Sequence, residues 1–286
     1  MKAGDIVIHP GKPELGVGVI LGMEHDKAHI RWEYAPATKY LTSFLQPAPE
    51  GIVIPSKFTQ PFDQIRNQKS TPLKVQIDRF LKQYPMGCDD SKFIDDERIY
   101  KEKAAAHFHA ILGPSQITAL LRQNDFAHIV SLALEAFGPK HSNLLFPRFD
   151  TGEFPRLKNG LKNAKIHERF AHVLYNALDT SSDTQKAFDA YADFLGEIDA
   201  DAWANVTIPF FFADYKKYIF VKSTIFQKAA DSCDYRIDCS KPITWKKYSR
   251  ILDFASYLKT KLDQTEKIRV KDMIDLQGFI YVAITR

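Results

Sequence analysis

The chain has 286 residues, of which 45% are hydrophobic and 26% are charged, which is ordinary for a globular protein and excludes a long low-complexity chain. It contains no run of about 18 apolar residues and no N-terminal apolar segment followed by small residues, so we expect neither a membrane span nor a secretory signal. The net charge of +4 lies outside the first 60 residues, where six basic and six acidic residues balance, and permits a polyanionic partner. The three cysteines form no CxxC pair, so we expect a reduced, cytoplasmic protein.

The first fifty residues contain short β-rich runs separated by glycine and proline. The candidate strands are 5–9, 17–23, 28–33 and 39–41. A polar turn, His25-Asp26-Lys27, separates the second from the third, and Gly16 and Gly18 indicate a bulge or tight bend. Short strands with such bends predict an SH3-like or Tudor-like barrel, which needs five of them.

Two groups of proline and glycine, at 47–51 and 55–57, mark the exit from this module. We therefore predict a barrel over 1–55, a linker over 56–70 and a mainly helical domain over 71–286. The predicted fold class is α+β, a small β-barrel followed by a larger helical domain.

Capping residues and apolar spacing predict the helices of the second domain. The first helix starts near Pro72. The others run over 91–112, 117–137 with a break near Asn124, 168–178, 185–195 with Ser182 as cap, 223–231, 244–262 and 271–283. Only Tyr218–Val221 is strand-like.

Basic residues follow the segment Asn143–Asp150 and suit phosphate contacts that position a protein on DNA. On one helix, three of the lysines would share a face. The alternatives are a solvated helix face and, for Asn143, a simple helix cap. The candidate DNA-binding residues here are Asn143, Arg148, Arg156, Lys158, Lys162 and Lys165.

The segment 203–222 interleaves aromatic residues with lysines. Rings beside cations are what stacking on an unpaired or extruded base requires. The alternative is that the phenylalanines are core and the lysine stems lie along it. The candidate contacts are Trp203, Phe210, Tyr215, Lys217 and Lys222.

Near the C-terminus, Asp272, Asp275 and Gln277 lie in an apolar setting and are the catalytic candidates. A carboxylate there would be partly desolvated, which is costly without a role. Alternatively, Asp272 caps the last helix and Asp275 pairs with Arg250 or Lys222.

The N-terminal pattern GDIVIHPGKPELGVGVIL resembles a small domain found at the C-terminus of UvrD-type helicases and, more distantly, in CarD-type transcription factors. Its first loop, Lys12–Leu15, is slightly longer. The resemblance implies contact with RNA polymerase, a helicase or nucleic acid, and such modules are also reused as generic adaptors.

Over roughly residues 100–284, the chain resembles a widespread bacterial family through NLLFP at 143–147, FVKS at 220–223 and KDMIDLQGFIYV at 271–282. The resemblance suggests a relation to anti-phage DNA glycosylases that excise modified bases. Ser223, Gly278 and Tyr281 stand where that family usually has Pro, Ser and Trp.

We therefore expect a protein that binds double-stranded DNA, with a monofunctional glycosylase acting on modified phage DNA as the main hypothesis. The positive charge that develops on the sugar calls for a carboxylate, and the extruded base calls for flat walls and an amide. This mechanism requires the acidic pair to face a cavity. The alternatives are a non-enzymatic DNA- or polymerase-binding factor and an adaptor or toxin-neutralising partner.

Several motifs are missing from the sequence. It has no GxxxxGK[ST], GxSxG or GxGxxG. His107 and His109 lack an HExxH pattern and a cysteine partner, so we expect no zinc site and no cofactor.

Overall fold

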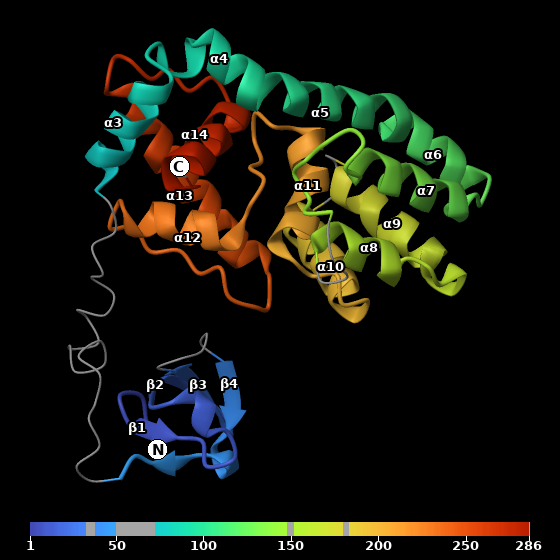
Figure 1. Cartoon of the computed structure of the whole chain (residues 1–286). Coiled ribbons are helices and arrows are strands. Elements are labelled where there is room, and N and C mark those ends of the chain that lie inside the picture. The colour runs from blue at the N-terminus through green and yellow to red at the C-terminus, as the bar shows by residue number, and fades with distance from the viewer. Residues whose placement is uncertain (33–37, 50–71, 148–151, 180–182, 286) are drawn as a thin grey trace. The chain divides into compact units, whose positions relative to one another are not determined.

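A computed structural model describes residues 1–32, 38–49, 72–147, 152–179 and 183–285 (Figure 1). The chain divides into two compact units, residues 1–70 and 71–286. The second unit begins where the helical domain was predicted to begin, and the predicted linker 56–70 lies outside the described residues.

The first unit is a five-stranded antiparallel sheet with strand order β4-β3-β2-β1-β5. Its strands are β1 (Ile6–Ile8), β2 (Gly18–Glu24), β3 (Lys27–Trp32), β4 (Thr38–Leu41) and β5 (Gln46–Pro47). The sheet curls but stays open, since β4 and β5 are not paired among the described residues. Alternate residues of β3, Ala28, Ile30 and Trp32, are buried and form its core with Val7 and Ile20. The predicted α+β class is therefore confirmed, whereas the predicted closed barrel is a half-barrel.

The turn between β2 and β3 lies where it was predicted, with Glu24 paired to Lys27 across two residues and His25 at φ 54°. The irregularity in β2 differs from the prediction. The register shifts between Ile20 and Gly22, rather than at Gly16 or Gly18. Gly16, at φ 70°, bends the chain before the strand.

We expect Gly18→Ala to open the sheet of the first unit. A Cβ at Gly18 would lie 2.5 Å from Cγ2 of Ile30 and 2.7 Å from the Trp32 ring, so overpacking would cost about 1–3 kcal/mol. Hydrogen exchange of peptides covering β2 and β3 in the full-length chain should accelerate. Gly22→Ala is the control, because no described atom outside the two adjoining residues lies within 4 Å of a Cβ there. Equal exchange in both variants would contradict the packing argument.

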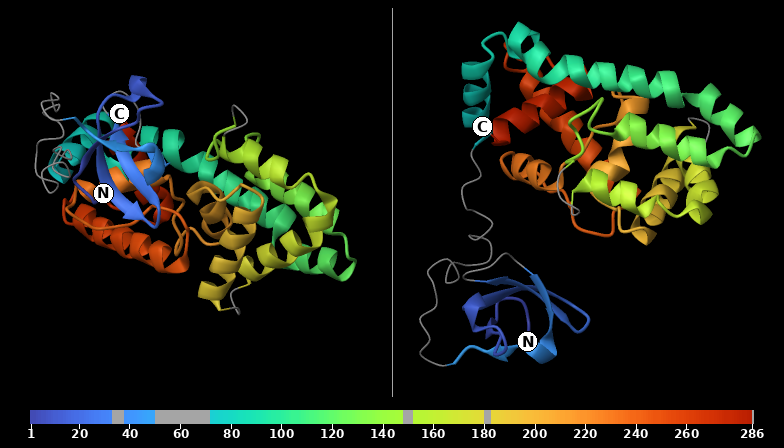
Figure 2. Two further views of the ribbon diagram at one scale, coloured as in Figure 1. Left: turned by 90° about the horizontal axis from the view of Figure 1, so that it is seen from below. Right: turned by 45° about the vertical axis from the view of Figure 1, so that its right-hand side comes forward.

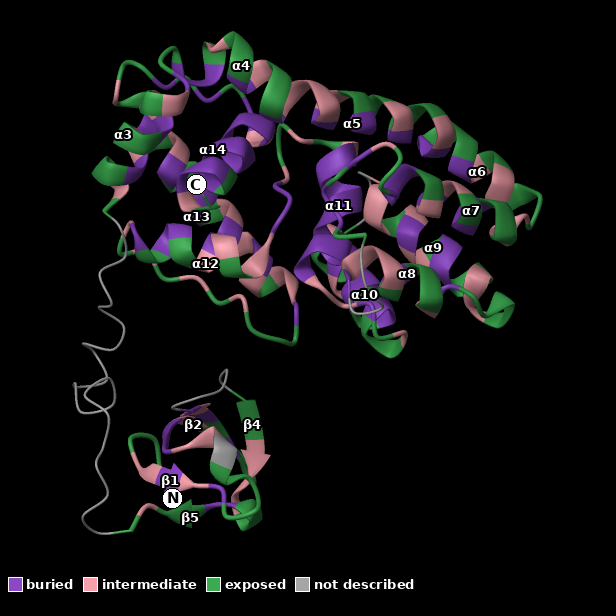
Figure 3. Cartoon of the chain, viewed as in Figure 1, coloured by how far each residue is buried: buried purple, intermediate pink, exposed green. Residues whose placement is uncertain are grey.

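The second unit is helical, and buried side chains from nearly all its helices form one core (Figure 3). Its helices are α3 (Leu73–Gln83), α4 (Ser91–Phe93), the π-helical turn η4 (Ile94–Arg98), α5 (Ile99–Leu112), α6 (Pro114–Arg122), α7 (Phe126–Phe137), α8 (Glu153–Gly160), α9 (His167–Leu178), α10 (Thr184–Glu197), α11 (Trp203–Ala213), α12 (Ser223–Asp231), α13 (Trp245–Asp263) and α14 (Met273–Thr285).

Two groups of helices lie side by side within this unit (Figures 1 and 2). In one, α14 packs against α3, α12, α13 and η4. In the other, α11 packs against α5, α8, α9 and α10. The long helix α5 continues from η4 past α11 and α7, so it links the two groups. No described helix is both long and apolar enough to cross a bilayer.

Most predicted helices are present within a few residues of their expected bounds. The predicted cap of α10, Ser182, lies outside the described residues. The residue that caps this helix is Asp183, whose carboxylate accepts from the amides of Gln185 and Lys186. Helix α13 begins directly after Thr244, within one residue of its predicted start, and the Thr244 side chain caps it by accepting from the Lys247 amide.

The segment Tyr218–Val221, predicted as a strand, pairs with no other strand among the described residues. Side-chain hydroxyl groups, rather than a neighbouring strand, form hydrogen bonds with its backbone. The Tyr248 hydroxyl accepts from the Ile219 amide and donates to its carbonyl, and Thr207 Oγ1 accepts from the Val221 amide.

Candidate functional site

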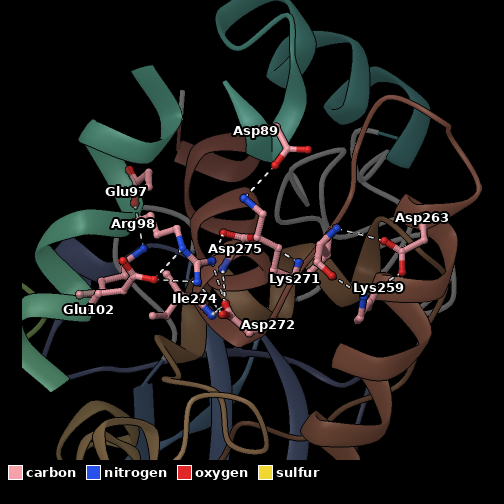
Figure 4. Close-up of polar contacts among 12 residues, drawn as sticks. Asp89, Glu97, Arg98, Glu102, Lys259, Asp263, Lys271, Asp272, Ile274 and Asp275 are labelled. Atoms are coloured by element: carbon pink, nitrogen blue, oxygen red, sulfur yellow. Dashed lines mark hydrogen bonds and ion pairs between the residues drawn. The ribbon is translucent and has the colours of Figure 1, made fainter. Parts of the chain in front are cut away.

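Arg98 holds both acidic residues that precede or begin the last helix (Figure 4). Its Nη2 lies 2.7 Å from Oδ2 of Asp272, and its Nη1 lies 2.6 Å from Oδ1 of Asp275. Arg98 belongs to η4, far away in sequence, and Glu102 also contacts it at 2.7 Å. The side chain of Asp275 is fully buried. The expected opening of this acidic pair onto a cavity is therefore wrong.

The structural alternative for Asp272 is confirmed, because its Oδ1 accepts from the Ile274 and Asp275 amides at the start of α14. Asp275 is paired, but not with the expected cations. Its second oxygen accepts from the Lys271 amide at 3.0 Å. Arg250 lies near Asp253, and Lys222 contacts Glu153 at 2.7 Å.

Burial and ion pairing shift the pKa values of this cluster in opposite directions. Burial disfavours the charged guanidinium, but the hydrogen bonds to Asp272 and Asp275 outweigh it and raise the pKa of Arg98. Burial raises the pKa of Asp275, although the Lys271 amide and Arg98 oppose this shift. Such a cluster locks α14 to η4 and occupies the carboxylates of Asp272 and Asp275.

A cavity of about 330 Å³ lies on the next turns of α14, at Gln277 and Tyr281. From η4 and α5, Asp96, Glu97 and Tyr100 line it. Its volume falls within the range of small-ligand sites, about 300–1,000 Å³. Neither Asp272 nor Asp275 is among its described lining residues.

Two further segments complete the cavity. Asn143, Leu144 and Phe146 line it from the loop after α7, and Phe220 and Lys222 from the segment before α12. Each of the three family-like segments, NLLFP, FVKS and KDMIDLQGFIYV, therefore contributes to one cavity. The sequence pattern placed Asn143, Lys222 and Gln277 among the site residues separately, and the fold brings these three together.

Comparison of the chain with protein-family models, curated proteins and solved structures finds no match.

Gln277 carries the most unusual polar atom of this cavity. Its side chain is 4% exposed, and its Oε1 is buried without a hydrogen-bond partner among the described residues. Buried polar atoms are usually satisfied, so an unpaired amide oxygen beside a cavity indicates a ligand that donates to it.

Glu97 and Lys101 form a buried ion pair at the cavity wall, with Oε2 and Nζ 3.0 Å apart. The π-helical turn η4 places Glu97 toward the cavity and the next residue, Arg98, toward α14. Such π-helical insertions are frequent at functional sites. Burial lowers the pKa of Lys101, and the neighbouring Glu97 opposes this shift.

Two of the positions at which the sequence differs from the resembled pattern lie on α14. Gly278 packs against α4 so closely that a Cβ would lie 2.9 Å from the ring of Phe93. Tyr281 places an aromatic ring at the cavity and is 38% exposed.

The remaining predicted residues lie elsewhere. Trp203 and Phe210 are core residues of α11, and the Trp203 indole donates to the carbonyl of Cys239. Phe210 also lines a second cavity with Lys217. Tyr215 is half-buried, and its carbonyl accepts from the Met273 amide. The core alternative is therefore confirmed for Phe210.

The predicted lysine stripe does not lie on one helix. Helix α8 ends at Gly160, whose Cα lies so close to the chain at Ile198 that a Cβ would be 2.7 Å from its carbonyl oxygen. Lys162 follows that end, and Lys165 belongs to a separate short turn, so the one-face prediction is wrong. Arg156, Lys158, Lys162 and Lys165 are all exposed. Arg148 lies outside the described residues.

The sequence pattern did not reveal Glu97, Arg98, Tyr100 and Lys101. Their signal was weak, because the run Asp95-Asp96-Glu97-Arg98 is typical of a solvated helix face. The i, i+4 spacing of Glu97 and Lys101 was the one sign of an ion pair between them. That spacing does not indicate a buried pair, because it is also common on exposed helices.

Proposed function

We propose that the helical unit binds a base extruded from DNA in the cavity beside Gln277 and hydrolyses its N-glycosidic bond. The observation that carries the proposal is the buried Oε1 of Gln277, which has no hydrogen-bond partner among the described residues. The described lining of its cavity also includes a second amide, two carboxylates and four aromatic rings.

The wall chemistry suits a nucleobase. Side-chain amides such as Gln277 and Asn143 match the donor and acceptor pattern on a base edge. Tyr100, Phe220 and Tyr281 supply flat apolar surface for its faces. A base must leave the stack to reach such a cavity, which is the general route of enzymes that act on bases.

Glu97 takes the role that was expected of the aspartates. In the proposed reaction, water adds to C1′ of the sugar, the C1′–N bond breaks, and the base leaves with a proton. A carboxylate beside the sugar stabilises the positive charge that develops there and orients the water. Lys101 compensates the buried Glu97 carboxylate.

A water-using reaction fits the lysines of the cavity better than a covalent Schiff base. Lys222, the lysine among the described lining residues, is bound to Glu153. Lys101 is fully buried behind Glu97. Outside the cavity, the exposed residues Arg156, Lys158, Lys162 and Lys165 offer phosphate contacts, which predict salt-dependent binding to DNA.

The test uses the full-length protein with end-labelled duplexes that carry unmodified or modified bases, including DNA from phages with modified bases. Abasic sites, revealed by alkaline cleavage, should form with at least one modified duplex. The double variant Glu97→Gln/Lys101→Met, which removes both buried charges together, should remain folded by circular dichroism and lose base release.

Two results would contradict the proposal. Base release that is unchanged in the Glu97→Gln/Lys101→Met variant would remove Glu97 from the reaction. Salt-dependent DNA binding without abasic sites on any duplex would favour the non-enzymatic accessory factor instead.

A further inference from the structure

Two histidines and a glutamate meet beside the C-terminal end of α7. His107 lies on α5, Glu135 on α7, and His141 in the segment that follows α7. Oε1 of Glu135 lies 3.2 Å from Nε2 of His107 and 3.8 Å from Nε2 of His141. The two imidazole rings stack, with centroids 3.8 Å apart and planes 17° from parallel.

The ring nitrogens that face Glu135 are unsatisfied. Both Nε2 atoms are buried, and neither makes an aligned hydrogen bond within the described residues despite the short distances to Glu135. Two orphaned imidazole nitrogens beside one carboxylate oxygen are costly unless a further atom joins them.

We propose that His107, Glu135 and His141 bind a divalent transition-metal ion, with Zn²⁺ the best match to the donor set. Two imidazoles and one carboxylate form a common three-ligand set for zinc, and a fourth position is then left to water or another ligand. The Glu135 side chain is 44% exposed, so solvent reaches this side of the cluster.

The distances suit this ion. With bonds of about 2.0–2.2 Å in a tetrahedral arrangement, neighbouring ligand atoms lie about 3.4 Å apart. The three ligand atoms already lie within 4.8 Å of one another. Because the lone pair of an imidazole lies in its ring plane, the two stacked rings must turn out of their stack for both Nε2 atoms to bind one ion.

The ion would fasten the loop after α7 to α5. His141 lies two residues before Asn143, and Asn143 and Leu144 line the cavity beside Gln277. The site is thus a structural clamp on one wall of that cavity. The expectation of no zinc site rested on the lack of a short motif, whereas these ligands come from separate elements, and His109 is not one of them.

The test is direct metal binding by the full-length protein after treatment with a chelator. Titration with ZnCl₂ in a calorimeter should show one saturable equivalent, and Co²⁺ should give the visible absorption bands of a four-coordinate ion. His107→Gln and His141→Gln should each weaken zinc binding at least about tenfold. This readout does not depend on base release, so either proposal can fail alone.

His109→Gln is the matched control, because His109 is exposed on the same helix two residues from His107. It should bind zinc as the unaltered chain does. Absence of a saturable equivalent, or zinc binding that His141→Gln and His109→Gln weaken equally, would overturn the proposal.

Discussion

Replacing Arg98 with alanine is expected to lower the free energy of unfolding by about 3–5 kcal/mol, because it leaves buried carboxylates without their counter-charge. Asp275 is fully buried and Asp272 nearly so, and both depend on the Arg98 guanidinium. A loss of this size is a large part of the stability of an ordinary domain. Urea denaturation followed by circular dichroism measures it.

Two controls separate this cluster from a general charge effect. Arg250→Ala removes an arginine whose pair with Asp253 is exposed, so its cost should stay within about 0.5 kcal/mol. Adding Asp272→Asn and Asp275→Asn to Arg98→Met removes all three charges, and should recover part of the loss. If Arg98→Ala and Arg250→Ala cost the same, the cluster does not hold α14 in place.

Replacing Gln277 with leucine is expected to reduce base release by about 10²-fold while leaving stability unchanged or slightly higher. An amide that pairs with the base only in the complex contributes to the reaction and not to folding. Its buried Oε1 has no hydrogen-bond partner among the described residues, so an apolar residue of similar size removes an unsatisfied group. Single-turnover base release and urea denaturation give the two values.

Gln76 is the matched control for this variant. It is also a buried glutamine, 3% exposed, but it lies on α3 outside the described lining of the cavity, and its Oε1 accepts from the Ser232 hydroxyl. Gln76→Leu should therefore lower the unfolding free energy by about 1–3 kcal/mol and leave base release by the folded protein unchanged. The opposite pattern, with Gln277→Leu unstable and still active, would show that Gln277 is an ordinary core residue.

Local sequence determined most of the secondary structure. Helices with a polar face, such as α9, α10 and α13, follow from apolar spacing, because each needs only to bury one face, and capping side chains also mark the starts of α10 and α13. The β2–β3 turn follows from His25-Asp26 for a similar local reason. Helix α11 does not follow from apolar spacing, since ten of its eleven residues are buried and no polar face marks its period.

The site depended on contacts between segments that lie far apart in the chain. Sequence determined that Asp272 and Asp275 sit among apolar residues and that an acid there needs a partner, but the partner, Arg98, lies more than 170 residues away. The same holds for Glu97 at the cavity and for His107, Glu135 and His141. Desolvation makes each of these groups depend on a partner, and only tertiary packing decides which residue that partner is.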